Sequence, residues 1–212
     1  MGIAVAVLSI AGAITLGAMS PGPSFIMVAR TSLAVSRTDG IAAAFGMGAA
    51  GVLFSIAAVL GLQAVMNAVP SFYAVVKVLG GTYLLYLGYL IWRGASKPVS
   101  LSGMLRESNG RRTLRRSFLL GLATQVSNPK TAVVYASIFA SLLPREFPIS
   151  VIAGLPLLVF LIETGWYSTV AVALSAPSPR ATYLRSKSKI DRIAGGVMAA
   201  LGIKLVLGAR QL

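Results

Sequence analysis

Two short proline motifs stand at the end of, or inside, long apolar segments and concentrate polar residues there. With their neighbours they comprise Ser20, Pro21, Gly22, Pro23 and Ser24, then Ser127, Asn128, Pro129 and Lys130. Each motif predicts a helix start, with Ser20 or Asn128 as N-cap and the next proline at the first helical position. Free amides and the positive dipole end of a helix start attract anions, and Lys130 adds a full charge. We therefore predict that these nine residues bind a carboxylate, as in an amino acid or small organic acid.

Glu163 is the only acidic residue in the interior of an apolar segment. A charged carboxylate there costs about 3 kcal/mol or more, so the neutral acid is favoured and a proton-carrying role is predicted. Contact with a substrate amine is a second role, and permanent pairing with Lys77 or Lys130 is the structural alternative. Trp166 and Tyr167 follow closely in the sequence and either line the same cavity or pack in the core. Lys77 is predicted to support the site or to reach the membrane interface.

The residue types that are missing exclude several kinds of chemistry. The chain has no cysteine and no histidine, which rules out disulfides, thiol chemistry, Ser–His proteases and the usual zinc sites. Only five acidic residues are present, so a carboxylate-rich metal or glycosidase site is not expected. We expect no metal, no cofactor and no enzymatic activity. The remaining enzymatic alternative is an intramembrane Ser–Lys dyad that uses Lys130.

Helices in a membrane must position these residues. Of the 212 residues, 56% are apolar and 11% charged, whereas soluble domains carry about a quarter charged residues. Segments of about 20 residues, enough to cross a hydrocarbon core, lie at 3–22, 40–66, 70–93, 117–143, 148–176 and 190–209. The first has no Lys or Arg before its apolar run, which argues against a cleaved signal peptide. A single transmembrane domain over residues 1–212 is predicted.

The distribution of Lys and Arg predicts the orientation of these segments. Fourteen of the nineteen lie in the stretches 23–39, 93–116 and 177–192, whereas Arg145 and Arg210 lie on the other side. The positive-inside rule then makes the three basic loops cytoplasmic and places both termini outside. We interpret the cluster at 106–116 as a topology determinant beside membrane lipid rather than a site for anionic lipid or nucleic acid.

The spacing of the two motifs indicates an internal repeat. They lie 107 residues apart, with three segments in each half, and an odd number inverts the second half. Lys130 lies 14 residues beyond Arg116, about 21 Å along a helix, so the second break is near the bilayer centre. We predict an all-α membrane protein of six transmembrane helices in two inverted three-helix repeats, with helices one and four broken. The two repeats are 1–93 and 117–212, and the loop 94–116 joins them. The alternative interpretation is that the prolines only kink packed helices.

Small residues recur at helix-packing intervals. Gly40, Ala44 and Gly48 are spaced by four residues, and the glycines at 80, 81 and 88 echo those at 195, 196 and 202. Such faces let helix backbones approach closely in lipid and are compatible with a homodimer.

Together these motifs resemble the LysE/RhtB family of bacterial amino acid exporters, over nearly the whole chain. The resemblance rests on the motif at 20–23, Arg30, Gly46-Met47-Gly48, Lys77, Gly80-Gly81-Thr82-Tyr83-Leu84-Leu85-Tyr86-Leu87-Gly88 and Asn128-Pro129-Lys130. Leu161-Ile162-Glu163-Thr164-Gly165-Trp166-Tyr167, with Ile190-Asp191, looks most like the homoserine/threonine efflux members.

The resemblance implies a six-helix exporter of amino acids in the bacterial inner membrane, driven by the proton gradient. Residues that match the family's motif positions are Pro21, Gly22, Pro23, Asn128, Pro129 and Lys130. Family members often have an acidic or amide residue at the position of Ser24, so Glu163 is expected to recognise the substrate amine. We predict proton-coupled alternating access for a small, threonine- or homoserine-like amino acid. A passive channel and a structural membrane subunit are the alternatives.

Overall fold

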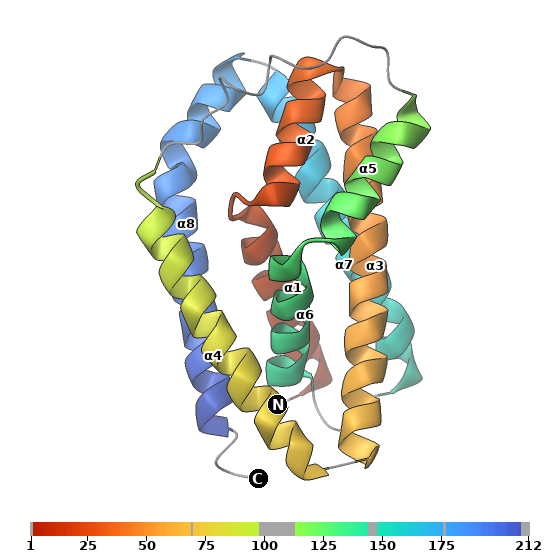
Figure 1. The fold of residues 1–212 in the computed structure, drawn as a ribbon, viewed down its shortest axis with the longest axis vertical. Helices are drawn as coiled ribbons and strands as arrows, with labels where there is room; N and C mark the ends of the chain where they lie inside the picture. Colours follow the sequence, from red (N-terminus) through yellow and green to blue (C-terminus); the bar gives the residue numbers. More distant parts are fainter. Residues whose placement is uncertain (1, 69, 98–112, 144–147, 176, 209–212) are drawn as a thin grey trace.

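The computed structural model describes residues 2–68, 70–97, 113–143, 148–175 and 177–208, apart from the side chains at 63, 65–68, 70–74, 76–77 and 177–180. This part of the chain forms eight helices packed in one bundle (Figure 1). Their bounds are α1 Ile3–Met19, α2 Pro23–Ala34, α3 Arg37–Ala68, α4 Pro70–Gly94, α5 Leu114–Val126, α6 Pro129–Leu142, α7 Ile149–Ser175 and α8 Pro177–Gly208.

Two of the described helices are each long and apolar enough to cross a membrane. They are the stretch Arg37–Leu62 of α3 and all of α7, with mean hydropathies of 2.0 and 1.9. α1 and α2 pass the same test together as one broken span, bent by 58°. The chain is therefore an all-helical membrane protein in its described part, and the arrangement of six spans stays a prediction.

The first proline motif interrupts the helix between α1 and α2, but the prediction that Ser20 is the N-cap of the second half is wrong. Ser20 is the C-cap of α1, and its N–H donates to the Leu16 carbonyl at 3.3 Å. Gly22 is the N-cap of α2, and Pro23 takes the first helical position. A residue before proline avoids helical backbone angles. Since Ser20 precedes Pro21 and Gly22 precedes Pro23, the helix restarts only at the second proline.

The second motif breaks the chain between α5 and α6 as predicted. α5 ends at Val126, with Ser127 as its C-cap, and α6 begins at Pro129. Asn128 is the N-cap, because its Oδ1 accepts a hydrogen bond from the Lys130 amide at 3.1 Å. The short polar side chain thus satisfies one of the free amides of the new helix.

Two stretches expected as basic loops are mostly helical. Residues 23–34 form α2, and residues 177–192 form the first half of α8. Hydropathy marks only the apolar part of a helix, whereas Ala, Leu, Lys and Arg are good helix formers in water as well. Pro177 at the first position also suits a helix start. In the stretch 94–116, residues 98–112 lie outside the described part.

Glycines allow close packing between helices that are distant in the sequence. A Cβ built on Gly46 of α3 would lie 2.1 Å from the Phe118 carbonyl oxygen of α5. The echoed glycines face one another across α4 and α8, with Gly88 against Gly195 and Gly81 against Gly202. α3 also packs along α7. The small residues that suggested a homodimer are thus largely used within the chain.

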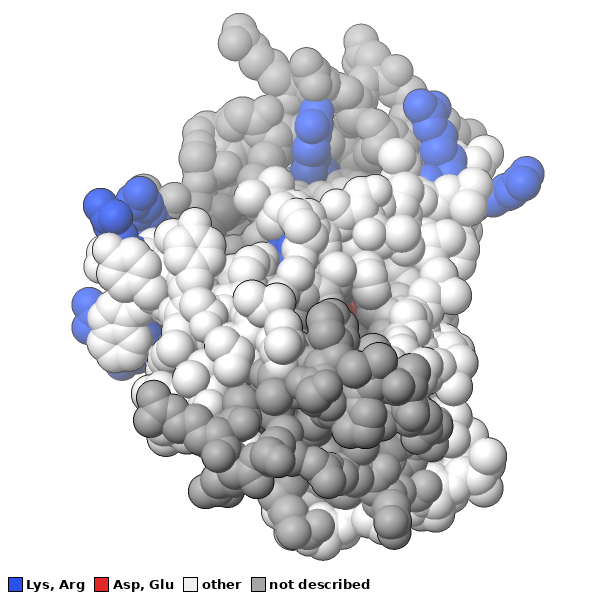
Figure 2. All heavy atoms as spheres, turned by 60° about the horizontal axis from the view of Figure 1, so that its bottom comes forward, with Lys and Arg blue, Asp and Glu red and all other residues white. Residues whose placement is uncertain are grey.

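Each half of one broken helix packs against the opposite half of the other. α1 packs against α6 and α2 against α5, so the four helix ends at the breaks meet in the middle of the bundle (Figure 1). The start of α1 and the end of α8 lie at the end of the bundle opposite the α2–α3 and α7–α8 junctions (Figure 1). Lys and Arg gather toward one end and one flank of the face drawn in Figure 2.

Candidate functional site

A cavity lies where the two breaks meet. It holds about 400 Å³ of space, its open mouth included. The lining residues are Ile14, Gly17, Ala18, Ser20, Gly22, Ser24, Phe25, Gln125, Asn128, Lys130, Thr131, Val134, Tyr135, Glu163 and Tyr167. Both proline motifs and the buried acid, which are far apart in the sequence, therefore line one cavity.

The nine predicted site residues divide into two groups. The five that line the cavity are Ser20, Gly22, Ser24, Asn128 and Lys130. Pro21, Pro23 and Pro129 do not line it and instead set where the helices stop and restart. Ser127 is exposed at the end of α5.

The supporting residues also separate. Tyr167 lines the cavity, whereas Trp166 packs beside an apolar cluster that includes Phe25 and Met47. The indole N–H of Trp166 is buried and has no hydrogen-bond partner among the described residues. The side chain of Lys77 lies outside the described part.

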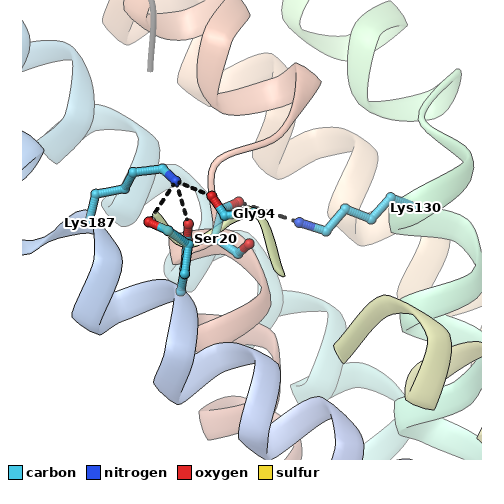
Figure 3. Close-up of polar contacts among 6 residues, drawn as sticks. Ser20, Gly94, Lys130 and Lys187 are labelled. Atoms are coloured by element: carbon cyan, nitrogen blue, oxygen red, sulfur yellow. Dashed lines mark hydrogen bonds and ion pairs between the residues drawn. The ribbon is translucent and has the colours of Figure 1, made fainter. Parts of the chain in front are cut away.

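The two breaks contact each other directly through polar groups. Asn128 Nδ2 on the α6 side donates to Ser24 Oγ on α2 at 3.0 Å. Lys130 Nζ points toward the end of α1, where it donates to the Ser20 carbonyl at 3.4 Å (Figure 3). An ammonium at a helix C-terminus is favoured by the negative end of the dipole. The Lys130 charge therefore stands at the junction of three helix ends.

Glu163 is buried among neutral hydrogen-bond donors. Its side chain on α7 is 2% exposed, and it accepts from Gln125 Nε2 at 2.7 Å and from Tyr135 Oη at 2.8 Å. Lys130 is not among its hydrogen-bond or ion-pair partners, because the Lys130 ammonium binds the Ser20 carbonyl instead. The alternative of a permanent ion pair with Lys130 is therefore wrong in this structure. The absence of a side chain at Gly51 of α3 makes space for this carboxylate, since a Cβ there would lie 3.1 Å from Glu163 Oε2.

Three polar residues of the cavity were not predicted from the sequence. Gln125 is 1% exposed and bonds both to Glu163 and, through its amide oxygen, to Ser24 Oγ. Thr131 and Tyr135 are one helical turn apart on α6, so they share a face. An amide two residues before Ser127, in a largely apolar segment, is the sequence signal that could have identified Gln125.

The remaining wall of the cavity is apolar. Ile14, Gly17 and Ala18 come from the last turns of α1, and Val134 comes from α6. Polar groups at one side and small apolar groups at the other suit a ligand with a charged end and a short apolar side chain.

A second buried polar cluster lies on α8, outside the cavity lining. Lys187 and Asp191 form an ion pair at 2.8 Å, and Lys187 Nζ donates to the carbonyls of Gly94 and Ala95 at 3.0 and 3.4 Å (Figure 3). A cation at the last carbonyls of α4 is favoured by the helix dipole. This cluster therefore joins the end of α4 to α8.

The chain is similar to known membrane proteins over most of its length. The family model described as LysE type translocator matches residues 15–209. The threonine efflux protein of Escherichia coli K12 is 30% identical over 189 residues, covering 89% of this chain and 91% of that protein. The threonine efflux protein of Salmonella typhi is 30% identical over 194 residues, with the same coverage. An uncharacterized membrane protein of Haemophilus influenzae is 29% identical over 191 residues, covering 90% of each chain.

No solved structure matches the chain. The family predicted from the two proline motifs is confirmed by a match that covers both motifs and Glu163. The chain therefore belongs to the LysE type translocator family, whose members are membrane transporters and not enzymes.

Proposed function

We propose that the protein exports a small, threonine- or homoserine-like amino acid across the bacterial inner membrane, by alternating access coupled to protons. The observation that carries this proposal is the cavity between the two breaks, with Lys130 and Glu163 at its polar side. The threonine efflux proteins that the chain resembles support the substrate class.

The carboxylate of the amino acid is proposed to bind where α2 and α6 begin. The N-cap of α2 is Gly22, which has no side chain to occupy the first amides of that helix. Helix starts and an ammonium are the groups that bind carboxylates in proteins. Lys130 lies close by, because a Cβ on Gly22 would be 3.6 Å from its Nζ.

The ammonium of the amino acid is proposed to bind Glu163. One carboxylate can hold either an ammonium or a proton, so the two compete for this residue. A carrier that returns with a proton after releasing the amino acid outside would exchange one for the other. The apolar wall of Ile14, Ala18 and Val134 is left for a short side chain.

The reciprocal helix contacts support six spans in two inverted repeats. In two inverted repeats, α1, α2, α3 and α4 would be equivalent to α5, α6, α7 and α8. The contact of α1 with α6 is then equivalent to the contact of α5 with α2. The contacts of α3 with α7 and of α4 with α8 each join two equivalent helices, as an internal two-fold axis requires. The Lys and Arg distribution supports basic loops in the cytoplasm and both termini outside. A homodimer stays a prediction.

The decisive experiment is transport by purified protein in vesicles. Vesicles preloaded with labelled threonine or homoserine are expected to show saturable counterflow, and a pH gradient is expected to accelerate efflux. A flux that does not saturate, or that lacks counterflow, would indicate a passive channel instead.

Replacing the acid tests its role in coupling. Glu163→Gln is expected to abolish the acceleration by the pH gradient while the protein still inserts into the membrane. Thr169→Val is the matched control, because Thr169 is exposed on the same helix. An unchanged effect of the gradient in Glu163→Gln would remove this residue from the coupling mechanism.

A further inference from the structure

Gln125 joins the acid of the site to both broken helices. Its amide nitrogen donates to Glu163 Oε2 at 2.7 Å. Its amide oxygen accepts from Ser24 Oγ on α2 and from Thr131 Oγ1 on α6, the latter at 3.5 Å. An amide oxygen has two acceptor positions, and an amide nitrogen has two N–H groups. The side chain of Gln125 thus separates one carboxylate from two hydroxyl groups.

One chain of hydrogen bonds in this network runs from Asn128 to Glu163, and the phenol of Tyr167 also contacts Ser24 and Gln125. Asn128 Nδ2 donates to Ser24 Oγ, Ser24 donates to Gln125, and Gln125 donates to the acid. Tyr135 donates to the other carboxylate oxygen. A carboxyl group that only accepts is ionised. In this state the hydroxyl protons of Ser24 and Thr131 are therefore engaged by Gln125 and do not point into the cavity.

Protonation of Glu163 on the oxygen that faces Gln125 reverses this network. The new O–H needs an acceptor, but Gln125 presents N–H there. A half turn of the amide gives its oxygen to the acid and its two N–H groups to the Ser24 and Thr131 oxygens. If the proton were instead on the Tyr135 side, the phenol proton would lose its acceptor, and no other is recorded for it among the described residues. A buried unsatisfied donor costs about 1–3 kcal/mol, so the half turn of the amide is favoured.

We propose that Gln125 is a positioning residue that reports the protonation of Glu163 to the carboxylate end of the site. When the acid gains a proton, the hydroxyls of Ser24 and Thr131 are released and donate into the cavity, which both residues line. The proposal rests on the proposed function, because it requires Glu163 to exchange a proton during transport.

The two ends of an amino acid then respond to the proton in opposite ways. Protonation removes the partner of the ammonium and adds two donors for the carboxylate. A carboxylate that lacks the amine gains the two donors and also escapes the repulsion of the ionised Glu163, and only the first of these gains requires Gln125. Its affinity is therefore expected to rise as the pH falls, which a simple competition between proton and amine would not produce.

Other titratable groups also face Glu163. Tyr135 and Lys130 on α6 and Tyr167 on α7 line the same cavity, and the charge of Asp191 on α8 acts on Lys130. α3 has no titratable residue after Asp39, and its Gly51 faces the carboxylate. The variants that test the proposal keep all these groups, so a difference between them is assigned to the amide.

The test is the binding of 3-hydroxybutyrate, which is threonine without its amine, to the purified full chain in nanodiscs between pH 5.5 and 8. Wild type is expected to bind more tightly at low pH, by about tenfold for each released hydroxyl. Gln125→Met, which is similar in length but has no amide to donate or accept, is expected to keep only the weaker pH dependence that the charges of Glu163 and Lys130 produce. Ser24→Ala and Thr131→Val should each remove about half of the effect on a logarithmic scale.

Several results would overturn the proposal. The first is that wild type does not bind 3-hydroxybutyrate, or binds it with an affinity that is constant or lower at low pH. The second is that the affinity of Gln125→Met depends on pH as strongly as that of wild type. The vesicle experiment separates this from the proposed function. Proton-driven export by wild type with a constant affinity for 3-hydroxybutyrate would reject the relay alone, whereas export without any effect of the gradient would reject the coupling itself.

Discussion

Two ionisable side chains with different surroundings define the polar side of the cavity. Lys130 meets a helix C-terminus, whereas Glu163 meets an amide and a phenol and has no cation among its recorded partners. A buried acid without a counter-charge is expensive, and such residues in membrane segments usually have a function. The cost is consistent with a group that holds a proton or an ammonium for part of a transport cycle.

The charge of Lys130 is expected to act on the carboxylate of the substrate. Lys130→Gln should raise the KM for threonine counterflow by about 10–100-fold, because a hydrogen bond to a charged group contributes about 1.5–3 kcal/mol. Inhibition of transport by threonine amide, which lacks the carboxylate, should change little. Lys204→Gln, exposed on α8, is the control. Equal losses for both ligands would show that Lys130 serves the structure rather than the substrate.

At the scale of the helices, glycine contacts hold the bundle together where the breaks weaken it. α1, α2, α5 and α6 have 12 to 17 residues each, shorter than a membrane span, and depend on packing against longer helices. α3 provides much of that packing through Gly46, Gly48 and Gly51, which face α5 and α7. Glycine permits this approach because it has no Cβ.

Alanine substitutions on α3 test this packing. Gly46→Ala places a methyl group against the backbone of α5 and is expected to destabilise the protein by about 1–3 kcal/mol. Gly61→Ala on the same helix meets nothing within 4 Å and should be neutral or slightly stabilising. Thermal unfolding of both variants in detergent measures the difference. A Gly46→Ala protein as stable as Gly61→Ala would contradict the close contact of α3 and α5.

For the whole molecule, the α2–α3 and α7–α8 junctions lie at one end of the bundle, whereas the start of α1 and the end of α8 lie at the other (Figure 1). The break region lies between these two ends, a position that suits the proposed alternating access to its cavity. Lys187 joins the end of α4 to the first half of α8, which suggests that these two helices move together.

Labelling of single cysteines tests the orientation, because the chain has none of its own. Gly2→Cys lies near the N-terminus, and Ala181→Cys is exposed near the start of α8. A membrane-impermeant maleimide applied to intact spheroplasts is expected to label Gly2→Cys, and Ala181→Cys only after permeabilisation. The reverse pattern would invert the proposed topology.

Local features of the sequence were sufficient to identify the breaks, the helical membrane fold and the family. Asn128 and Pro129 act through neighbouring backbone atoms, so their effect does not depend on distant parts of the chain. The first break shows the limit of this local reasoning. Both Pro21 and Pro23 suit the first position of a helix, and α2 begins at Pro23.

The identity of the site's network depended on tertiary structure. Gln125, Tyr135 and Glu163 belong to three helices, and which faces these helices turn to one another follows from packing at Gly46, Gly51 and similar contacts. Hydropathy along the chain does not contain these rotations, because every face of such a helix is largely apolar. The sequence therefore determined which residues could bind a charged ligand, and only the packed bundle decided which of them meet.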